Sequence, residues 1–211
     1  MSHAQYFNDA ARIWDDNPVR HEMAHALFHG IQQYAPLHEK IVALDFGAGT
    51  GLVTLPMAGR VGSMVAVDAS PEMLAVLQEK ARTAGLNIHT QIYDGVEYPD
   101  LGCNFDVIVS TMVLHHMPNP EELISQFKQW LKPGGHLAIA DLEPEDGSFH
   151  GDNPTVHHHG FDPQQVSEWA RQQGMTIMAL DQPYRIRKPQ DDGHLREYPV
   201  FLLVAGVPEE I

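Results

Sequence analysis

Short apolar runs alternate with segments of helical periodicity through the middle of the chain. The apolar runs predict five strands, at residues 41–46, 63–68, 88–93, 105–110 and 135–141. Several of these runs are nearly continuous in Val, Ile, Ala and Leu, as is typical of strands covered on both faces of a parallel sheet. The helical segments lie at about residues 50–60, 71–84 and 120–131. This alternation predicts an α/β fold with a doubly wound, mostly parallel sheet.

Capping residues and prolines support the helix boundaries. Ser70 precedes Pro71 and Asn119 precedes Pro120, so two predicted helices begin with a polar cap and a first-turn proline. Pro56 lies inside the first predicted helix, where a proline removes a backbone hydrogen bond and is expected to kink the helix.

The two ends of the chain differ from the middle. Residues 1–40 have a helical pattern and no strand, and residues 162–173 predict one more helix. Two late strands follow, at 175–181 and 199–206, and the polar, proline-containing residues 182–198 between them predict a loop. Since no helix separates these strands, we expect an antiparallel pair at one edge of the sheet.

The charge balance bears on the possible ligands. Thirteen Lys and Arg stand against 28 Asp and Glu, which gives a formal net charge of −15. A surface this acidic repels phosphate backbones, so nucleic acid is not an expected partner. The charge suits a small neutral or cationic ligand, or serves solubility alone.

The sequence also indicates a compartment. Cys103 is the only cysteine, so no intrachain disulfide can form, as suits a reducing environment. The first residues do not have the pattern of a signal peptide, and no stretch approaches the roughly 18 apolar residues of a membrane span. We therefore expect a cytoplasmic protein without a membrane span.

A glycine-rich turn follows the first predicted strand. Gly47, Gly49 and Gly51 stand at every second position there. Because glycine has no Cβ, such a turn allows a ligand to approach bare backbone, and the following helix offers unpaired N–H groups. The turn predicts a site for a nucleotide-type cofactor.

An aspartate ends the second predicted strand. Asp68 is placed to accept hydrogen bonds from both hydroxyls of a ribose at the carboxyl ends of the strands. A nicotinamide dehydrogenase uses the same two devices, but its third glycine usually comes one residue later. Tyr184 and Lys188 have the Tyr-x-x-x-Lys spacing of some dehydrogenases, although they fall in the predicted loop.

Three further segments help to identify the cofactor. They are Asp94-Gly95 after the third strand, residues 105–117, and residues 131–137. With the glycine turn, this ordered set resembles the class I S-adenosylmethionine-dependent methyltransferases, most closely the small-molecule enzymes related to quinone biosynthesis. The resemblance implies a seven-stranded sheet of order 3-2-1-4-5-7-6 with strand 7 antiparallel. We expect one domain over residues 1–211, with a helical cap (1–40), a cofactor-binding core (41–141) and a final part (142–211).

The resemblance also implies S-adenosylmethionine as cofactor and S-adenosylhomocysteine as product. The positions that match the family's cofactor site are Asp45, Gly47, Gly49, Gly51, Asp68, Ala69, Asp94, Gly95, Ser110 and Thr111. The first four surround the methionine portion in the family. Asp68 matches the ribose-binding acid, and Asp94 the residue that binds the adenine amino group. Asp45 could instead cap the turn, and Asp94 could be a turn residue.

Methyl transfer is an in-line displacement, so the protein mainly aligns the acceptor and excludes water. A base helps when the acceptor must lose a proton, and histidine suits that task near neutral pH. His115 is our first candidate base and His159 our second. His115 could equally line the cofactor pocket. The run His157 to His159 could bind zinc, but adjacent side chains point apart and no cysteine is near, so no metal is predicted.

Two N-terminal aromatics and one arginine complete the candidates. Trp14 is predicted to contact the cofactor, with Tyr6 beside it as a second aromatic wall, or both anchor a helix. Arg20 could reach the cofactor carboxylate, but an exposed arginine on a helix is the favoured interpretation. The main alternative functions are a non-catalytic S-adenosylmethionine-binding protein and a nicotinamide dehydrogenase. The acceptor atom is open among O, N, C and S, and so is the oligomeric state.

Overall fold

The computed structural model describes residues 3–151, 153, 155–190 and 193–209. Its centre is a seven-stranded sheet of order β3-β2-β1-β4-β5-β7-β6, which confirms the predicted order. The strands are β1 (Val42–Phe46), β2 (Ser63–Asp68), β3 (Ile88–Ile92), β4 (Phe105–Thr111), β5 (Leu131–Leu142), β6 (Thr176–Pro189) and β7 (Leu195–Gly206). The first five are parallel, and β7 is antiparallel to both β5 and β6.

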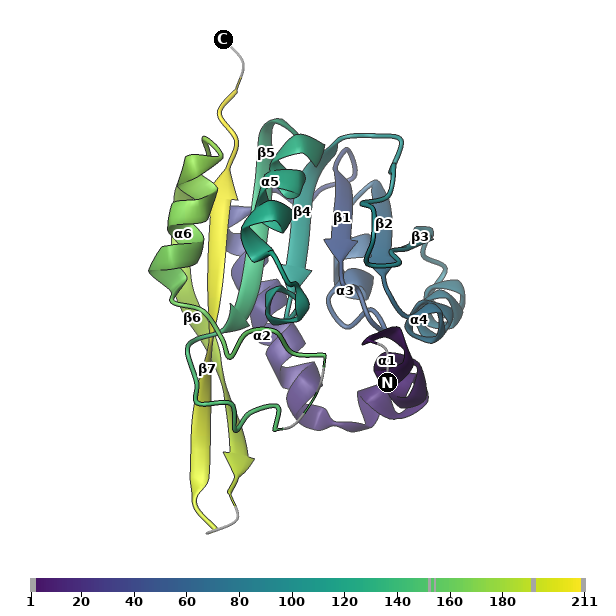
Figure 1. Ribbon diagram of the computed structural model, residues 1–211. Helices are drawn as coiled ribbons and strands as arrows, with labels where there is room; N and C mark the ends of the chain where they lie inside the picture. The colour runs from purple at the N-terminus through teal and green to yellow at the C-terminus, as the bar shows by residue number, and fades with distance from the viewer. Residues whose placement is uncertain (1–2, 152, 154, 191–192, 210–211) are drawn as a thin grey trace.

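Helices cover both faces of this sheet (Figure 1). They are α1 (His3–Ala10), α2 (Pro18–Tyr34), α3 (Thr54–Ala58), α4 (Pro71–Ala84), α5 (Pro120–Trp130) and α6 (Pro163–Gln172), with 3-10 helices η1 (Ala11–Asp16) and η2 (Leu114–His116). One core layer joins α5 and α6 to the sheet, and a second joins α2 and α3 to its other face. The arrowheads of β1, β2 and β4 point to the end of the sheet where α1 lies (Figure 1). Strand-end residues therefore meet beneath the N-terminal segment.

The predicted caps are confirmed at α4 and absent at α5. The Ser70 hydroxyl accepts a hydrogen bond from the Met73 N–H at 3.1 Å, directly before Pro71. Asn119 makes no side-chain cap hydrogen bond. Its amide instead donates to the Glu122 carboxylate at 3.3 Å. At this helix start the proline and the first-turn acids remain as favourable features.

The first predicted helix was too long, because α3 covers only Thr54–Ala58. Residues 50–53 belong to the turn that follows β1. Pro56 is the third residue of α3, and the N–H groups of its neighbours Leu55 and Met57 donate to the carbonyls four residues earlier, of Gly51 and Val53. The proline therefore removes the one hydrogen bond that would lie between these two.

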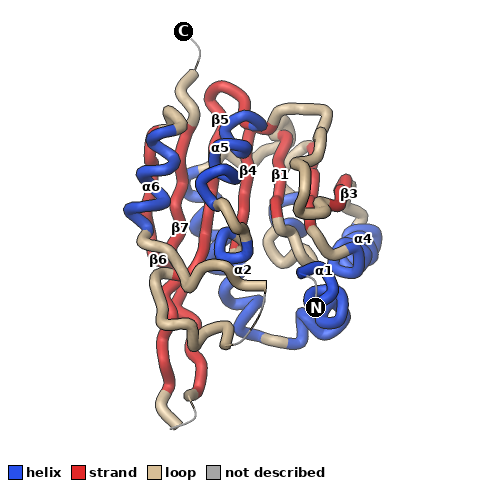
Figure 2. The backbone as a smooth tube through the Cα atoms, in the orientation of Figure 1, coloured by secondary structure: helices blue, strands red, loops and turns tan. Residues whose placement is uncertain are grey.

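The predicted loop at 182–198 is wrong, since β6 and β7 continue through most of it as one long hairpin. Tyr184 pairs with Val200 and Lys188 with Arg196. The register shifts between Asp181 and Tyr184, around Pro183, and this irregularity breaks the alternation by which a strand is recognised. The hairpin extends past the ends of the other strands (Figures 1 and 2).

The hairpin is anchored to α2 by two tyrosines. The Tyr34 hydroxyl donates to the Asp181 carboxylate at 2.9 Å, and the Tyr184 hydroxyl donates to Glu22 at 2.8 Å. These contacts hold β6 against the helix that borders the strand ends. Within the described part of the chain, no helix is both long and apolar enough to cross a membrane.

Candidate functional site

A cavity of about 1220 Å³ lies at the carboxyl ends of the parallel strands. This is where doubly wound sheets bind ligands. The predicted cofactor residues that line it are Trp14, Asp45, Gly47, Gly49, Asp68, Ala69, Asp94, Gly95 and Thr111. His115, Tyr6 and Arg20 line it as well. The structure thus brings most of the predicted site to one place.

The glycine turn has the backbone that the sequence predicted. Gly47 has φ +80°, and a Cβ there would meet Val113 Cγ2 at 2.1 Å. Gly49 has φ +55° and open space beside it within the cavity lining. Only a residue without a side chain satisfies the first position at low cost. The turn therefore exposes backbone to the cavity.

Asp45 at the end of β1 is a buried carboxylate with one oxygen in use. Its Oδ2 accepts a hydrogen bond from the Thr54 hydroxyl at 2.6 Å. Its Oδ1 is buried without a partner among the described residues. Burial raises the pKa of this carboxyl to about 7, and the neighbouring Asp68 adds to the rise. An unpaired buried oxygen facing a cavity fits a ligand that brings a cationic amine.

Asp68 at the end of β2 holds the glycine turn in place. Its Oδ2 accepts from the Gly49 N–H at 2.7 Å, and its Oδ1 accepts from the Ser70 N–H at 2.8 Å. Burial raises the pKa of this carboxyl, and the backbone hydrogen bonds oppose the rise. Asp68 therefore shapes the site and also lines it.

Asp94 is a turn residue that also lies at the cavity, so its position is compatible with both roles that the sequence left open. Its Oδ1 accepts from the Val96 N–H at 2.9 Å, which is an Asx turn, and the residue also lines the cavity. The side chain is exposed, in contrast to Asp45. The turn fixes the carboxylate at the mouth of the cavity without using both of its oxygens.

Three predicted site residues lie outside the cavity lining: Gly51, Ser110 and His159. A Cβ at Gly51 would meet Leu77 Cγ at 2.9 Å, so this glycine allows α4 to pack. The Ser110 hydroxyl donates to the Phe46 carbonyl at 3.0 Å and ties β4 to β1. His159 lies 3.4 Å from Glu145 with a half-exposed side chain, so His159 does not face the cavity.

The N-terminal segment lies over the cavity through contacts that the sequence reading missed. Asp15 accepts from the Thr50 hydroxyl at 2.6 Å and from the Lys80 ammonium at 2.6 Å. The Ser70 hydroxyl donates to the Asn8 amide oxygen at 2.6 Å. The only signal for these contacts in the sequence was the presence of polar residues in an otherwise amphipathic segment. These contacts hold α1 and η1 against the glycine turn and the start of α4.

Trp14 and Arg20 form one unit at the edge of the cavity. The Arg20 guanidinium lies 3.6 Å from the Trp14 ring centroid, and its Nη1 donates to the Trp14 carbonyl at 2.8 Å. Phe7 packs edge-on against Trp14, with ring centroids 5.7 Å apart. The aromatic wall predicted from Trp14 and Tyr6 therefore includes Phe7.

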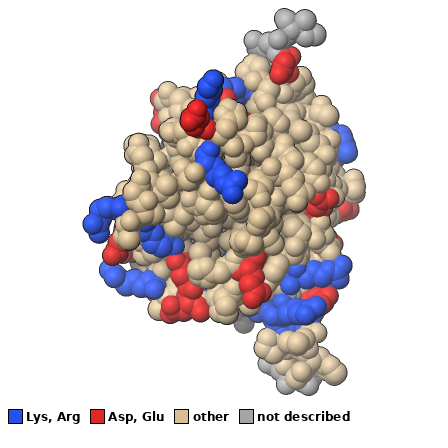
Figure 3. Space-filling model, turned by 180° about the vertical axis from the view of Figure 1, so that it is seen from behind, with Lys and Arg blue, Asp and Glu red and all other residues tan. Residues whose placement is uncertain are grey.

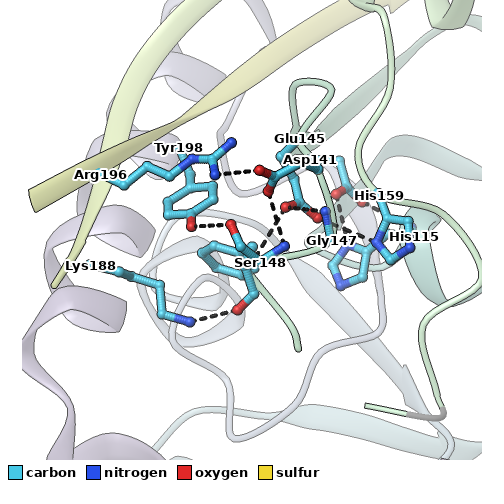
Figure 4. Close-up of polar contacts among 11 residues, drawn as sticks. His115, Asp141, Glu145, Gly147, Ser148, His159, Lys188, Arg196 and Tyr198 are labelled. Atoms are coloured by element: carbon cyan, nitrogen blue, oxygen red, sulfur yellow. Dashed lines mark hydrogen bonds and ion pairs between the residues drawn. The ribbon is translucent and has the colours of Figure 1, made fainter. Parts of the chain in front are cut away.

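His115 in η2 is paired with a residue that the sequence reading did not single out. Its Nδ1 lies 2.7 Å from Asp141 Oδ1, and both side chains are buried (Figure 4). Asp141 also accepts from the backbone N–H groups of His115 and Leu142, at 3.2 and 2.7 Å. Since the carboxyl occupies Nδ1, the other ring nitrogen is left for the cavity.

Other histidines surround this pair. His150 also lines the cavity, with its ring centroid 4.6 Å from that of His115. Of the run at 157–159, the N–H groups of His157 and His158 donate to the His115 carbonyl, at 2.9 and 3.2 Å. The His158 ring bonds the Met117 carbonyl. Within the described ranges, no three His, Cys, Asp or Glu side chains come together as metal ligands.

The end of β4 has an uncommon backbone. Met112 has φ 59°, and it is the only non-glycine residue with positive φ in the described part of the chain. It lies between Thr111 and Val113, which also line the cavity. Non-glycine residues in this conformation carry strain and gather at functional sites.

A family model described as a methyltransferase domain matches residues 19–181. The chain belongs to the class I S-adenosylmethionine-dependent methyltransferases. The chain has the strand order that the resemblance implied. Its glycine turn and unpaired Asp45 oxygen are compatible with the family's cofactor.

The chain is similar to curated relatives over part of their length. An uncharacterized methyltransferase of Schizosaccharomyces pombe is 31% identical over 139 residues, 58% of this chain and 49% of that protein. A ubiquinone biosynthesis O-methyltransferase of Cereibacter sphaeroides is 31% identical over 106 residues, 50% of this chain and 43% of that protein. The chain thus spans about half the length of these relatives. The crystal structure of the YcgJ protein of Bacillus subtilis shares the fold, with TM-score 0.70, 17% identity, and coverage of 89% of this chain and 99% of that one.

Proposed function

We propose that this protein transfers a methyl group from S-adenosylmethionine to a hydroxyl oxygen of a small organic acceptor, with His115 as general base. The observation that carries the proposal is the buried His115–Asp141 pair, which lines the same cavity as the glycine turn. When bound, the cofactor supplies a methyl group that is already activated and open to in-line displacement. The chain's own residues then have to bind and orient the cofactor and the acceptor, and to take the proton from the acceptor hydroxyl.

Cofactor residues follow from the geometry above. Asp45 would accept from the amino group through its unpaired Oδ1, and Asp68 would accept from the ribose hydroxyls. Asp94 and Gly95 would lie at the adenine. Trp14, Phe7 and the N-terminal segment would exclude water above them.

His115 would handle the proton. With its Nδ1–H donated to Asp141, the Nε2 lone pair is available to take a hydroxyl proton from an acceptor in the cavity. The Asp141 carboxylate then stabilises the imidazolium that forms, and two backbone N–H groups hold that carboxylate in place. Oxygen is favoured because a hydroxyl must lose a proton during transfer, and a relative's name specifies an O-methyltransferase.

Charge and size support a small acceptor. The cavity of about 1220 Å³ has to hold cofactor and acceptor together, which leaves room for a compact molecule. The net charge of −15 disfavours nucleic acid. The face in Figure 3 shows lysines and arginines interspersed with acidic residues and no continuous basic band.

Calorimetric titration and radiolabel transfer test the function together. We expect S-adenosylmethionine and S-adenosylhomocysteine to bind and NADH not to bind. With labelled cofactor and a panel of phenolic and aliphatic alcohols, label should appear in an ether product. Binding of both sulfur compounds without transfer to any acceptor would favour the non-catalytic cofactor-binding protein, and binding of NADH alone would favour the dehydrogenase.

Replacing Asp68 by alanine is expected to weaken S-adenosylhomocysteine binding about 10- to 100-fold. The change removes a carboxylate that binds the Gly49 N–H and lines the cavity, and hydrogen bonds to charged groups are worth about 1.5–3 kcal/mol. Asp106→Ala is the matched control, because Asp106 also accepts a backbone N–H, from Val42 at 2.8 Å, but lies outside the cavity lining. Equal affinities of the two variants would remove Asp68 from the site.

A further inference from the structure

The charged side chains of the cavity are sorted by sign. Its acidic lining residues, Asp45, Asp68 and Asp94, lie at the carboxyl ends of the first three strands, on the proposed cofactor side. The N-terminal segment and α2 also line the cavity, with Arg20 as their charged residue. A further wall comes from η2, the loop after β5 and the strand β6. Among the described residues of that wall, the charged ones are Arg187 and Lys188, and none is acidic. In a chain of net charge −15, this end of the cavity has the opposite sign to the whole.

Lys188 differs from the arginines near it on the hairpin. Arg187 pairs with Glu197 at 2.9 Å, Arg185 with the same carboxylate at 3.3 Å, and Arg196 with Asp146. Lys188 is half-buried and has no ion pair among the described residues. It shares the inner face of β6 with the buried Ile186.

Among the described residues, the Lys188 ammonium is held by neutral groups only. Its Nζ donates to the Phe149 carbonyl at 2.5 Å and lies 4.5 Å from the Phe149 ring centroid. Figure 4 shows the side chain reaching from β6 to the loop segment that carries Ser148. An ammonium has three donors, so two remain after this hydrogen bond.

His150 offers another donor beside the lysine. Its ring lies 4.6 Å from that of Phe149 and 4.6 Å from that of His115, measured between centroids. Its Nε2 is buried without a partner in the described structure. Burial lowers the pKa of His150 to about 3, and the nearby His115 and Lys188 contribute, so the ring is neutral. A neutral imidazole still has one N–H to donate.

We propose that the methyl acceptor carries an anionic group, such as a carboxylate, which Lys188 binds with the help of His150 while His115 faces the reacting hydroxyl. The contacts run without a break from Lys188 through Phe149 and His150 to His115. This inference rests on the proposed function and specifies its substrate class. It replaces the neutral or cationic ligand that the net charge alone suggested.

The test measures binding and does not depend on catalysis. Three phenolic acids, 4-hydroxybenzoate, 3,4-dihydroxybenzoate and 4-hydroxycinnamate, and the methyl ester of each are titrated calorimetrically into protein loaded with S-adenosylhomocysteine at pH 7.5. We expect at least one carboxylate to bind ten times or more tighter than its own ester. The preference should fall to within about twofold in Lys188→Gln and persist in part in Lys188→Arg.

Arg185→Gln is the matched control, because it removes the same charge from the same strand outside the cavity lining. It should keep the wild-type preference, and every variant should keep the affinity for S-adenosylhomocysteine. His150→Phe should weaken binding of the carboxylate and leave the ester unaffected. Esters that bind as tightly as their acids, a preference that survives in Lys188→Gln, or the absence of binding by all three acids would overturn the inference. Loss of methyl transfer with intact carboxylate binding would count against the proposed function alone.

Discussion

Replacing His115 by glutamine is expected to lower the rate of methyl transfer by about 10²- to 10⁴-fold, the usual contribution of a general base. Glutamine fills a similar volume and its amide can still donate to Asp141, so the buried carboxyl keeps a partner. What is lost is a nitrogen lone pair that can take the acceptor's proton. Single-turnover kinetics with labelled cofactor measures this step, and affinity for S-adenosylhomocysteine should change by less than about threefold.

Two further variants make this result interpretable. Asp141→Asn keeps the shape of the partner but no longer favours the Nδ1–H tautomer or the imidazolium, so it should also slow transfer. His159→Ala is the control, because His159 is a histidine of the same region whose side chain lies outside the cavity lining. If His159→Ala slows transfer as much as His115→Gln does, the base has been assigned to the wrong residue.

Replacing Asp45 by asparagine is expected to make the cofactor-free protein more stable at pH 8 by about 2 to 4 kcal/mol. Burial raises the pKa of the Asp45 carboxyl from 3.8 to about 7. The folded state therefore holds this proton more tightly than the unfolded state does. The resulting stability is fully present below pH 3.8 and is lost as the pH rises through 7, because the charge is then buried without a full set of partners. Asparagine carries no charge to bury.

Denaturation with urea at pH 5 and pH 8 measures the effect. The gain from Asp45→Asn should be larger at pH 8 than at pH 5, because the folded protein still holds the Asp45 proton at pH 5. Asp94→Asn is the control, since Asp94 lines the same cavity but is exposed, and this substitution should change the stability little. Cofactor affinity should move the other way, by about 10- to 100-fold, since the cationic amine loses its carboxylate. An Asp45→Asn protein that is no more stable at pH 8 than the wild type would contradict the raised pKa of the Asp45 carboxyl.

Most of the sheet could be predicted because its inner strands are short, apolar and buried on both faces. The predicted 63–68 coincides with β2, and 41–46 differs from β1 by one residue. The β6–β7 hairpin could not be predicted in the same way. Its outer half is exposed, its alternation is broken by two register shifts, and its pairing is a tertiary contact. Intrinsic strand propensity is a weak guide where tertiary pairing decides.

The site residues likewise fall into those that local sequence predicts and those that only the tertiary structure brings together. Residues within one turn, such as Gly47 and Gly49, could be predicted because local spacing alone places them together. The pair His115–Asp141 is 26 residues apart and meets only because β4 and β5 are neighbours. One signal was available, since Asp141 is an aspartate at the carboxyl end of a predicted apolar strand, as Asp45 and Asp68 are. His150 has no such signal, because its loop follows no regular pattern.

The contacts that hold the N-terminal segment have a consequence for the order of folding. Asn8 and Asp15 reach partners 35 to 65 positions further along the chain, at Thr50, Ser70 and Lys80. During synthesis these two residues leave the ribosome well before the residues that receive them. Docking of α1 and η1 therefore waits until the strands β1 and β2 and the helix α4 exist as a surface. The segment that is synthesised first therefore docks late. A nascent protein passes through a stage in which the strand ends that line the cavity are formed but α1 and η1 do not yet cover them.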